Sequence, residues 1–362
     1  MDISFTVSLY RILFRVIVAA LLVAGTASCQ FSDGAKAPFE NYLYRLSNSL
    51  DIPASVVNKE LSGESGKEVE SAQLVRYPSL RDLSHAIPPV NINLIEFFSL
   101  SSCDLQRHVG QRNSSLGRFM KPSQTLLYEY EFIRLAELCL PSLEPGSDLY
   151  KVLFEALTLK KEQLSLVKWN ALFASEEMAK LFSLGAQSLS FEHLKSTPST
   201  LYEAFETISL FSNNSITDPV AIEGAYAVIS SSKRIGELRL SMQMVTQYLS
   251  RADALLGYRV SNKPLCINEK SNPKFDVVNT VFMKFYIGEI QPYIALLYQQ
   301  EKILFEKTDK LVSSLKPTSA FQAFWDQVYK ADDSEWNKFD RAIQQHTKNW
   351  QALLSQCGRL PK

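Results

Sequence analysis

The sequence predicts an all-α protein, and three observations support that class. Apolar residues recur every three or four positions over long stretches, which is the spacing of one face of an α-helix. Sustained alternation of apolar and polar residues around Asn-Gly or Asp-Gly turns does not occur. The C-terminal half divides into three helical arms of similar length. We therefore expect a multi-helix protein with an irregular N-terminal arm and a long antiparallel C-terminal helical bundle.

The chain begins like a bacterial export signal. A short apolar run follows two arginines, and the small residues Thr26-Ala27-Ser28 precede Cys29. This arrangement predicts a signal peptide over residues 1–28 and a lipid on Cys29. Lipoprotein signals usually carry Leu where Thr26 stands, so cleavage nearby without lipidation is the alternative. Gln30 after Cys29 favours the outer membrane over the inner one.

The apolar run is too short for a permanent membrane anchor. Its length of about ten residues corresponds to roughly 15 Å of helix, half of the hydrocarbon core of a bilayer. We expect an outer-membrane lipoprotein of a Gram-negative cell envelope, facing the periplasm and held to the membrane through its N-terminal lipid.

The cysteines fit an oxidising compartment. Without Cys29 four remain, namely Cys103, Cys139, Cys266 and Cys357, and four cysteines allow three disulfide connectivities. Four buried free thiols are the alternative. None of them stands in a CxxC motif or in a cluster with zinc spacing, so a redox motif or a zinc site is not expected.

Charge and motifs exclude several functions. The chain holds 38 Lys and Arg against 38 Asp and Glu, which gives no electrostatic reason to expect nucleic acid as a partner. No glycine-rich phosphate loop is present, and the four histidines are scattered without metal-ligand spacing. We expect no cofactor and no metal.

The N-terminal parts are expected to be short elements. Residues 29–90 read as a lipid tether, a helix over 39–50 that Pro53 stops, and an irregular arm that lies over the helical body. Residues 91–215 form an N-terminal helical region. Its expected helices cover 92–100, 103–116 with Gly117 as a left-handed residue past the end, 124–139, 148–173, 175–186 and 200–212.

Residues 216–362 are expected to form the long bundle. The arms cover 218–257, 275–315 and 319–357, each about 40 residues or roughly 60 Å as helix. Asp218-Pro219 is a typical helix start, Pro292 predicts a kink in the second arm, and Asp332-Asp333-Ser334 predicts a brief interruption of the third.

The bundle predicts the disulfide partners. A chain that runs up one arm and back down an equal one returns to its starting end, so Cys266 and Cys357 should be neighbours. The same argument joins Cys103 to Cys139 across two antiparallel helices. The closed loops are long enough for each bond to add roughly 3–5 kcal/mol in the chain-entropy model.

The densest polar segment surrounds a predicted helix–turn–helix corner. Its side chains are Arg112, Asn113, Ser114, Arg118, Tyr128 and Glu129. One interpretation is a rigid polar corner, in which these groups cap helices and form ion pairs. The other is a pocket that holds an anionic or peptide ligand.

The order of several short motifs resembles a known family. The motifs are Tyr77-Pro78, Arg81-Asp82-Leu83, Cys103-Asp104-Leu105, the Arg-Asn-Ser-Ser-Leu-Gly run from Arg112, Pro122-Ser123-Gln124 and Leu127-Tyr128-Glu129. In this order they resemble the uncharacterised Gram-negative lipoproteins of the domain of unknown function 3080. The resemblance implies a lipid-anchored envelope protein and supplies no substrate or catalytic residue.

Two functions follow as hypotheses. The first is a non-enzymatic binding or scaffolding module with an envelope protein as its partner, because the helices are rod-like and no catalytic triad or metal set is evident. The alternative is an envelope enzyme or small-ligand binder with its polar site around Arg112 to Glu129.

Overall fold

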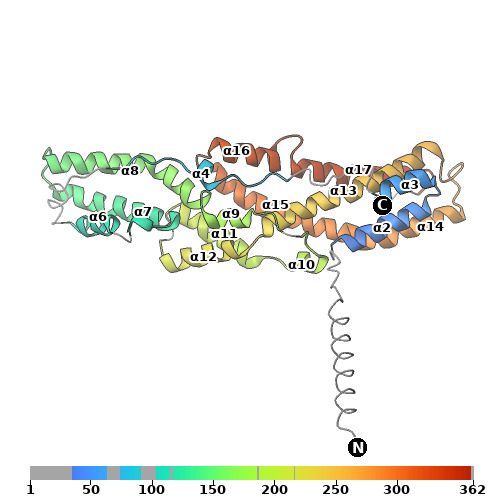
Figure 1. The fold of residues 1–362 in the computed structure, drawn as a ribbon, viewed down its shortest axis with the longest axis horizontal. Helices are drawn as coiled ribbons and strands as arrows, with labels where there is room; N and C mark the ends of the chain where they lie inside the picture. Colours follow the sequence, from blue (N-terminus) through green and yellow to red (C-terminus); the bar gives the residue numbers. More distant parts are fainter. Residues whose placement is uncertain are drawn as a thin grey trace, which may run out of the picture.

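The protein is an elongated rod of helices that run along its length (Figure 1). The computed structural model describes residues 35–62, 74–90, 103–114, 117–185, 187–215 and 217–359. The predicted signal peptide, Cys29 and the predicted helix at 92–100 lie outside these residues. The described ranges contain no strand, only one isolated bridge between Ile267 and Lys270. The all-α class is confirmed.

The helical segments follow one another along the chain and are labelled in Figure 1 where there is room. They are α2 (Lys36–Ser49), α3 (Ala54–Ser62), α4 (Leu80–Leu83), α6 (Leu105–Asn113), η2 (Gly117–Phe119), α7 (Pro122–Cys139), η3 (Leu140–Ser142), α8 (Asp148–Leu172), α9 (Glu176–Leu181), α10 (Phe191–Lys195), α11 (Ser199–Ser212), α12 (Pro219–Ser231), α13 (Arg234–Asn262), α14 (Pro273–Val281), η4 (Phe282–Ile290), α15 (Gln291–Ser313), α16 (Ser319–Trp325), η5 (Asp326–Lys330) and α17 (Glu335–Ser355). Of these, η4 and η5 are π-helices.

The N-terminal helix α2 belongs to the body of the rod. It packs against α13, α14 and η4, and it begins well inside the rod rather than at either tip (Figure 1). Residues 74–90 then cross the body mostly as extended chain. The Tyr77 hydroxyl donates to the Phe173 carbonyl at 2.8 Å, and Trp169 Nε1 donates to the Leu83 carbonyl at 2.8 Å. For these residues the expected irregular arm over the helical body is confirmed.

Helices α6, α7 and α8 form one end of the rod, which we call the outer arm. The apolar side chains of α6 and of the outer turns of α7 and α8 make a small core of their own. The inner turns of α7 and α8, which include Tyr130 and Trp169, belong to the large core of the rod. The start of α8 is capped by Ser147, whose hydroxyl accepts from the Tyr150 N–H at 3.2 Å. Such caps satisfy backbone donors that the first helical turn leaves unpaired.

The end of α6 differs from the prediction. The helix stops at Asn113, where Ser114 adopts an extended conformation, and Gly117 is not left-handed but opens the short helix η2. Glycine is needed at this position because the chain turns back closely. A Cβ on Gly117 would lie 2.2 Å from the Arg112 carbonyl oxygen.

The first predicted arm is divided into two helices. The prediction of one helix over 218–257 is wrong, because the chain is extended at Ser232 and α13 starts at Arg234. Three consecutive serines, 230–232, precede the break, and serine hydroxyls compete with helical hydrogen bonds. Consequently α12 packs on α9 and α11, while α13 packs on α2 and α17.

The second arm is continuous and contains a π-helix. Segments α14, η4 and α15 follow one another without a break, and η4 lies immediately before Pro292. Proline has no N–H and cannot complete an ordinary helical hydrogen bond to the carbonyl four residues earlier. The structure thus places a wider helical turn where the sequence predicted a kink.

The third arm has the predicted interruption. Helix α16 passes into η5, the chain leaves the helix at Ala331, and α17 starts again with Ser334 as its cap. Asp218 likewise caps α12, accepting from the Val220 N–H at 3.1 Å with Pro219 in the first turn.

Both predicted disulfides are present. Cys103 is bonded to Cys139 with their Cα atoms 5.7 Å apart, and Cys266 is bonded to Cys357 with their Cα atoms 5.0 Å apart. The first bond closes the outer arm. The second joins the chain after α13 to the end of α17, at the opposite end of the rod (Figure 1).

Candidate functional site

A cleft of about 670 Å³ lies between two helical walls near the Cys266–Cys357 end. One wall is α14 with η4, and the other is the C-terminal half of α17. Its volume falls within the range of about 300–1,000 Å³ that is typical of small-molecule sites. We therefore treat this cleft as the candidate functional site.

The floor of the cleft is aromatic. Phe282 and Trp350 have ring centroids 4.8 Å apart, and Tyr286 packs against both rings. Phe275 and Leu354 extend the floor, and all five side chains are buried. Met283 and Ile287 complete the apolar lining, with Met283 54% exposed.

A buried chain of hydrogen bonds holds the floor from behind. Trp350 Nε1 donates to the Tyr42 hydroxyl oxygen at 2.8 Å, and the Tyr42 oxygen lies 2.9 Å from His346 Nε2. His346 Nδ1 lies 2.5 Å from a carboxylate oxygen of Asp253. The chain thus ties α2, α13 and α17 together beneath the cleft.

The donors and acceptors of this chain are complementary in one arrangement. The indole N–H can only donate, and the Asp253 carboxylate only accepts. Every donor and acceptor in the chain has a partner when His346 carries its proton on Nδ1 and its Nε2 accepts from the Tyr42 O–H. Burial raises the pKa of Tyr42 well above its ordinary value, so this hydroxyl keeps its proton. His346 is fully buried, so these groups orient the floor and do not face the cleft.

The Tyr286 hydroxyl is protonated as well. Burial raises the pKa of this phenol, and a hydrogen bond with Thr347 only partly opposes the effect. Tyr286 and Thr347 come from the two different walls. Their bond links η4 to α17 at the edge of the cleft.

The rim is polar and carries both signs of charge. Its uncharged side chains are Asn279, Gln291, Thr347 and Gln351. Asp276 and Arg359 are the charged members, one in the first turn of α14 and the other just past α17. Gly358 takes a left-handed conformation (φ 68°) that turns the chain immediately before Arg359.

The predicted polar corner is assembled only in part. Arg112 donates to the Gly117 carbonyl, and its guanidinium lies 5.7 Å from the centre of the Tyr128 ring. The Ser114 hydroxyl donates to the Gln111 carbonyl at 2.7 Å and accepts from the Gly117 N–H at 3.1 Å. The side chains of Asn113 and Arg118 lie outside the described part of the chain.

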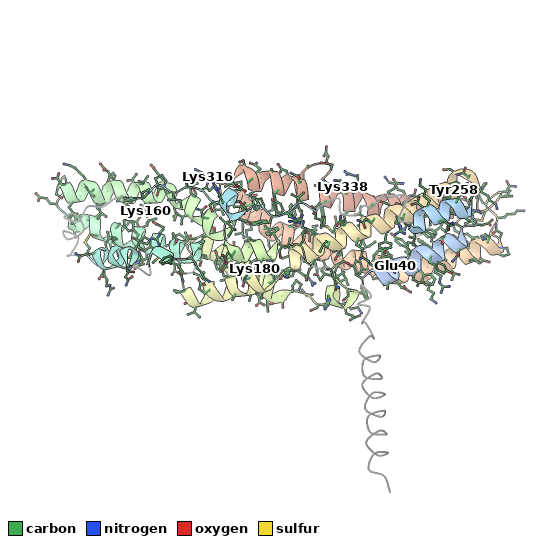
Figure 2. The ribbon with its side chains drawn as sticks, viewed as in Figure 1. Glu40, Lys160, Lys180, Tyr258, Lys316 and Lys338 are labelled. Atoms are coloured by element: carbon green, nitrogen blue, oxygen red, sulfur yellow. A yellow bond between two sulfur atoms is a disulfide. The ribbon has the colours of Figure 1, made fainter. Side chains whose placement is uncertain are left out.

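Glu129 finds a partner that the sequence analysis did not consider. Lys160 of α8, labelled in Figure 2, approaches one carboxylate oxygen of Glu129 at 2.5 Å. The other oxygen, Oε2, is buried without a hydrogen bond. The ring of Tyr128 is stacked on His108 with centroids 4.3 Å apart. These contacts join the three helices of the outer arm.

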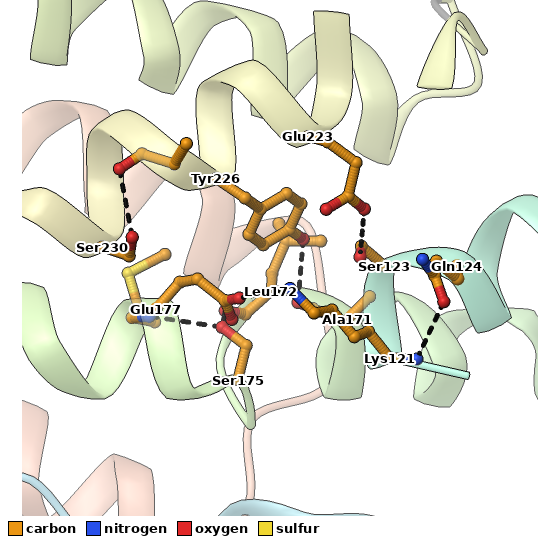
Figure 3. Close-up of polar contacts among 12 residues, drawn as sticks. Lys121, Ser123, Gln124, Ala171, Leu172, Ser175, Glu177, Glu223, Tyr226 and Ser230 are labelled. Carbon is orange, nitrogen blue, oxygen red and sulfur yellow. Dashed lines mark hydrogen bonds and ion pairs between the residues drawn. The ribbon is translucent and has the colours of Figure 1, made fainter. Parts of the chain in front are cut away.

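A further polar cluster joins the outer arm to the rest of the rod (Figure 3). The Ser123 hydroxyl donates to Glu223 of α12 at 2.9 Å, and Lys121 lies 3.7 Å from Glu177 of α9. The Tyr226 hydroxyl donates to the Ala171 carbonyl at 2.8 Å. The Pro122-Ser123-Gln124 motif therefore lies at a structural junction.

The cleft was not predicted from the sequence. Residues 347, 350, 351 and 354 have the spacing of one helical face, as do 275, 279, 282 and 286. The signal was therefore visible as two separate stripes. Nothing in the sequence indicated that these two stripes face each other.

The described residues include neither a candidate membrane span nor a candidate metal site. Within the ranges that the structure describes, no helix combines the length and apolar character needed to cross a bilayer. In that same part of the chain, no three His, Cys, Asp or Glu side chains gather where they could hold a metal ion.

The fold and the site define an all-α, disulfide-bonded helical rod with a cleft near one end. The chain belongs to the family described as protein of unknown function (DUF3080), which matches residues 39–361. Searches of curated proteins and of solved structures each gave no significant match.

Proposed function

We propose that the protein is an exported lipoprotein, anchored at Cys29 in the outer membrane, that acts as a non-enzymatic binding or scaffolding module. The export signal and the cysteine after it support the anchor. The pairing of the other four cysteines supports an oxidising compartment.

The main support for the binding function is the cleft between α14–η4 and α17. Its floor is fixed from behind, so a ligand or partner would meet a surface that is already ordered. The Asp253–His346 pair, which has the composition of an acid–base pair, lies behind Trp350 and orients that floor. This arrangement favours binding over catalysis.

Photo-crosslinking in living cells tests the binding function. A photoreactive amino acid replaces Gln351 on the rim or, as the control, Gln344, which is exposed on the same helix outside the cleft. We expect a discrete adduct, with a protein or a lipid, from position 351 and none from position 344. Equal labelling from both positions, or none from either, would contradict the proposal.

The anchor is tested separately. Mass spectrometry of the native N-terminus should find acyl chains on Cys29, and Cys29→Ala should release the protein from the membrane fraction. An unmodified residue 29, or cleavage beyond it, would show that the protein is secreted without a lipid.

A second candidate function is a small-ligand or enzyme site at the polar corner. The buried, unpartnered Oε2 of Glu129 favours it, since such an oxygen usually has a hydrogen-bond donor nearby. Tyr128 precedes Glu129 in α7, and the Arg112 guanidinium lies 5.7 Å from the centre of the Tyr128 ring. Substitution of Arg112 separates this function from a purely structural role, as described in the Discussion.

A further inference from the structure

We propose that the cleft binds a single-chain zwitterionic phospholipid, with its acyl chain along the aromatic floor and its head group between Asp276 and Arg359. The inference rests on the proposed binding function and names the chemical class of the ligand. Four features of the cleft support it, namely its length, its lining, its charges and the hydrogen bonds that hold its floor.

The cleft is elongated. Its lining runs along α14 and η4 to the first residue of α15, from Phe275 to Gln291, up to about 24 Å at the α-helical rise per residue. On the other wall the lining runs along α17 from Thr347 to Leu354 and reaches Arg359 just beyond it. A cleft elongated in this way suits one extended acyl chain.

The lining suits a flexible hydrocarbon chain. Rings of Phe282, Tyr286 and Trp350 form a continuous floor, and Met283 offers an adaptable thioether at the side. Burying one methylene group strengthens binding by up to roughly fourfold. Affinity should therefore rise with the length of the acyl chain.

The charges of the rim suit a zwitterionic head group. The start of α14 and the end of α17 meet at the same end of the rod, where the Cys266–Cys357 bond lies. Among the described residues, neither Asp276 nor Arg359 has an ion-pair partner within 4 Å. The guanidinium suits a phosphate, and the carboxylate suits an ammonium group. A fatty acid could pair with Arg359 but offers no ammonium group to Asp276.

The floor is fixed before a ligand arrives. The Trp350 ring is held by Tyr42 and His346, with indole Nε1 2.8 Å and 3.1 Å from their acceptor atoms. Because these side chains are already ordered, binding does not incur the entropic cost of ordering them, and affinity is higher. This favours capture of a single lipid molecule rather than loose contact with a bilayer surface.

Calorimetric titration of the purified full chain carrying Cys29→Ala tests the proposal. The substitution removes the protein's own lipid as a competing occupant. The probe is lysophosphatidylethanolamine below its critical micelle concentration. We expect one saturable site, with affinity that increases several-fold for each two added carbons. Heat without saturation, or no dependence on chain length, would overturn the proposal.

Matched variants test the position of the acyl chain. Met283 and Val277 are similarly exposed, 54% and 52%, but only Met283 lines the cleft. We expect Met283→Lys to weaken binding about tenfold or more and Val277→Lys to change it by less than about twofold. Equal effects of the two variants would place the lipid elsewhere.

Head-group variants test the charges. The intact cleft should prefer the ethanolamine head to the glycerol head, which has no ammonium group, and Asp276→Asn should abolish that preference. Tighter binding of palmitate than of lysophosphatidylethanolamine would overturn the proposal that the ligand has a zwitterionic head group. If no lipid binds while the crosslink at Gln351 still captures a protein, the ligand class is wrong and the proposed binding function stands.

Discussion

Each end of the rod is closed by a disulfide, but the two ends differ in what lies behind the bond. At the outer arm, Cys103–Cys139 covers a small separate core, and the polar groups make short contacts among neighbouring helices. At the other end, Cys266–Cys357 belongs to the large core, which extends from there to the inner turns of α7 and α8. A cleft with a fixed floor is found at this second end.

The two ends also differ in how far apart in the sequence their contacting residues lie. The outer arm is held by contacts such as Arg112 with Gly117, which are only five residues apart. The floor of the cleft is held by Tyr42 with His346, which are 304 residues apart. The floor of the cleft can form only when α2, α13 and α17 have packed together, while the polar contacts of the outer arm lie mainly among its own helices.

The largest expected effect comes from removing the disulfides. The loops are 91 residues for Cys266–Cys357 and 36 for Cys103–Cys139. In the chain-entropy model the first bond contributes about 4–5 kcal/mol and the second roughly 1 kcal/mol less. We expect this order in urea unfolding of the two double Cys→Ala variants.

Hydrogen exchange of the same variants sharpens the comparison. Loss of Cys103–Cys139 should release protection in α6 and in the outer turns of α7 and α8 only. Loss of Cys266–Cys357 should release protection in α13, α14 and α17 together. Uniform loss across the rod in both variants would mean that the two ends are not independent.

A second prediction concerns pH and the large core. Burial raises the pKa of Glu301 to about 7, whereas a carboxyl group in the unfolded chain titrates near 4.3. The folded state therefore binds more protons between these pH values, and stability should fall by up to about 3 kcal/mol as the pH rises from about 4 to 7.

Urea unfolding from pH 5 to 8 checks this prediction. Glu301→Gln should flatten the slope, because the amide does not titrate. Glu306→Gln, an exposed change on the same helix, should leave the slope unchanged. Since Glu301 belongs to the large-core helix α15, hydrogen exchange should report the pH effect there and not in the outer arm.

The third prediction compares two tyrosines. The Tyr42 hydroxyl bonds both His346 and Trp350 inside the core, whereas Tyr128 contributes mainly its ring, stacked on His108. Tyr42→Phe should cost about 1–3 kcal/mol because two buried polar groups lose a partner. Tyr128→Phe should change the free energy of unfolding by less than about 0.5 kcal/mol. Equal losses would remove the contrast between the two ends.

The smallest expected effect concerns the polar corner. Arg112→Ala removes the bond to the Gly117 carbonyl and the contact with the Tyr128 ring. A structural corner predicts a loss of about 1 kcal/mol in thermal or urea unfolding. A stability that stays unchanged would instead favour the small-ligand site at this corner.

Much of the fold could be predicted because its signals are local. Helical spacing, the helix start at Asp218 and the equal lengths of the second and third arms predicted the helices and then the two cysteine pairs. The break at Ser232 was missed because apolar residues continue at helical spacing across it. Tertiary packing, and not the local spacing of apolar residues, decides which faces of α12 and α13 contact which neighbouring helices.

The site could not be predicted for a related reason. His346 looked like an isolated histidine, since Asp253 is 93 residues away and Tyr42 still farther. Lys160 was likewise invisible as the partner of Glu129, because α8 had to be placed beside α7 first. Residues on different helices can be recognised as interacting partners only when the relative positions of those helices in the fold are known.

The position of α2 has a mechanical consequence. Since α2 starts inside the rod, a tether from Cys29 to Ala35 would join the body away from both tips, and six residues reach at most about 21 Å (Figure 1). Anchored in this way, the rod would be attached to the bilayer at an off-centre point. Its two disulfide-bonded ends would then move over unequal distances close to the bilayer, with the cleft on the shorter side of the attachment point.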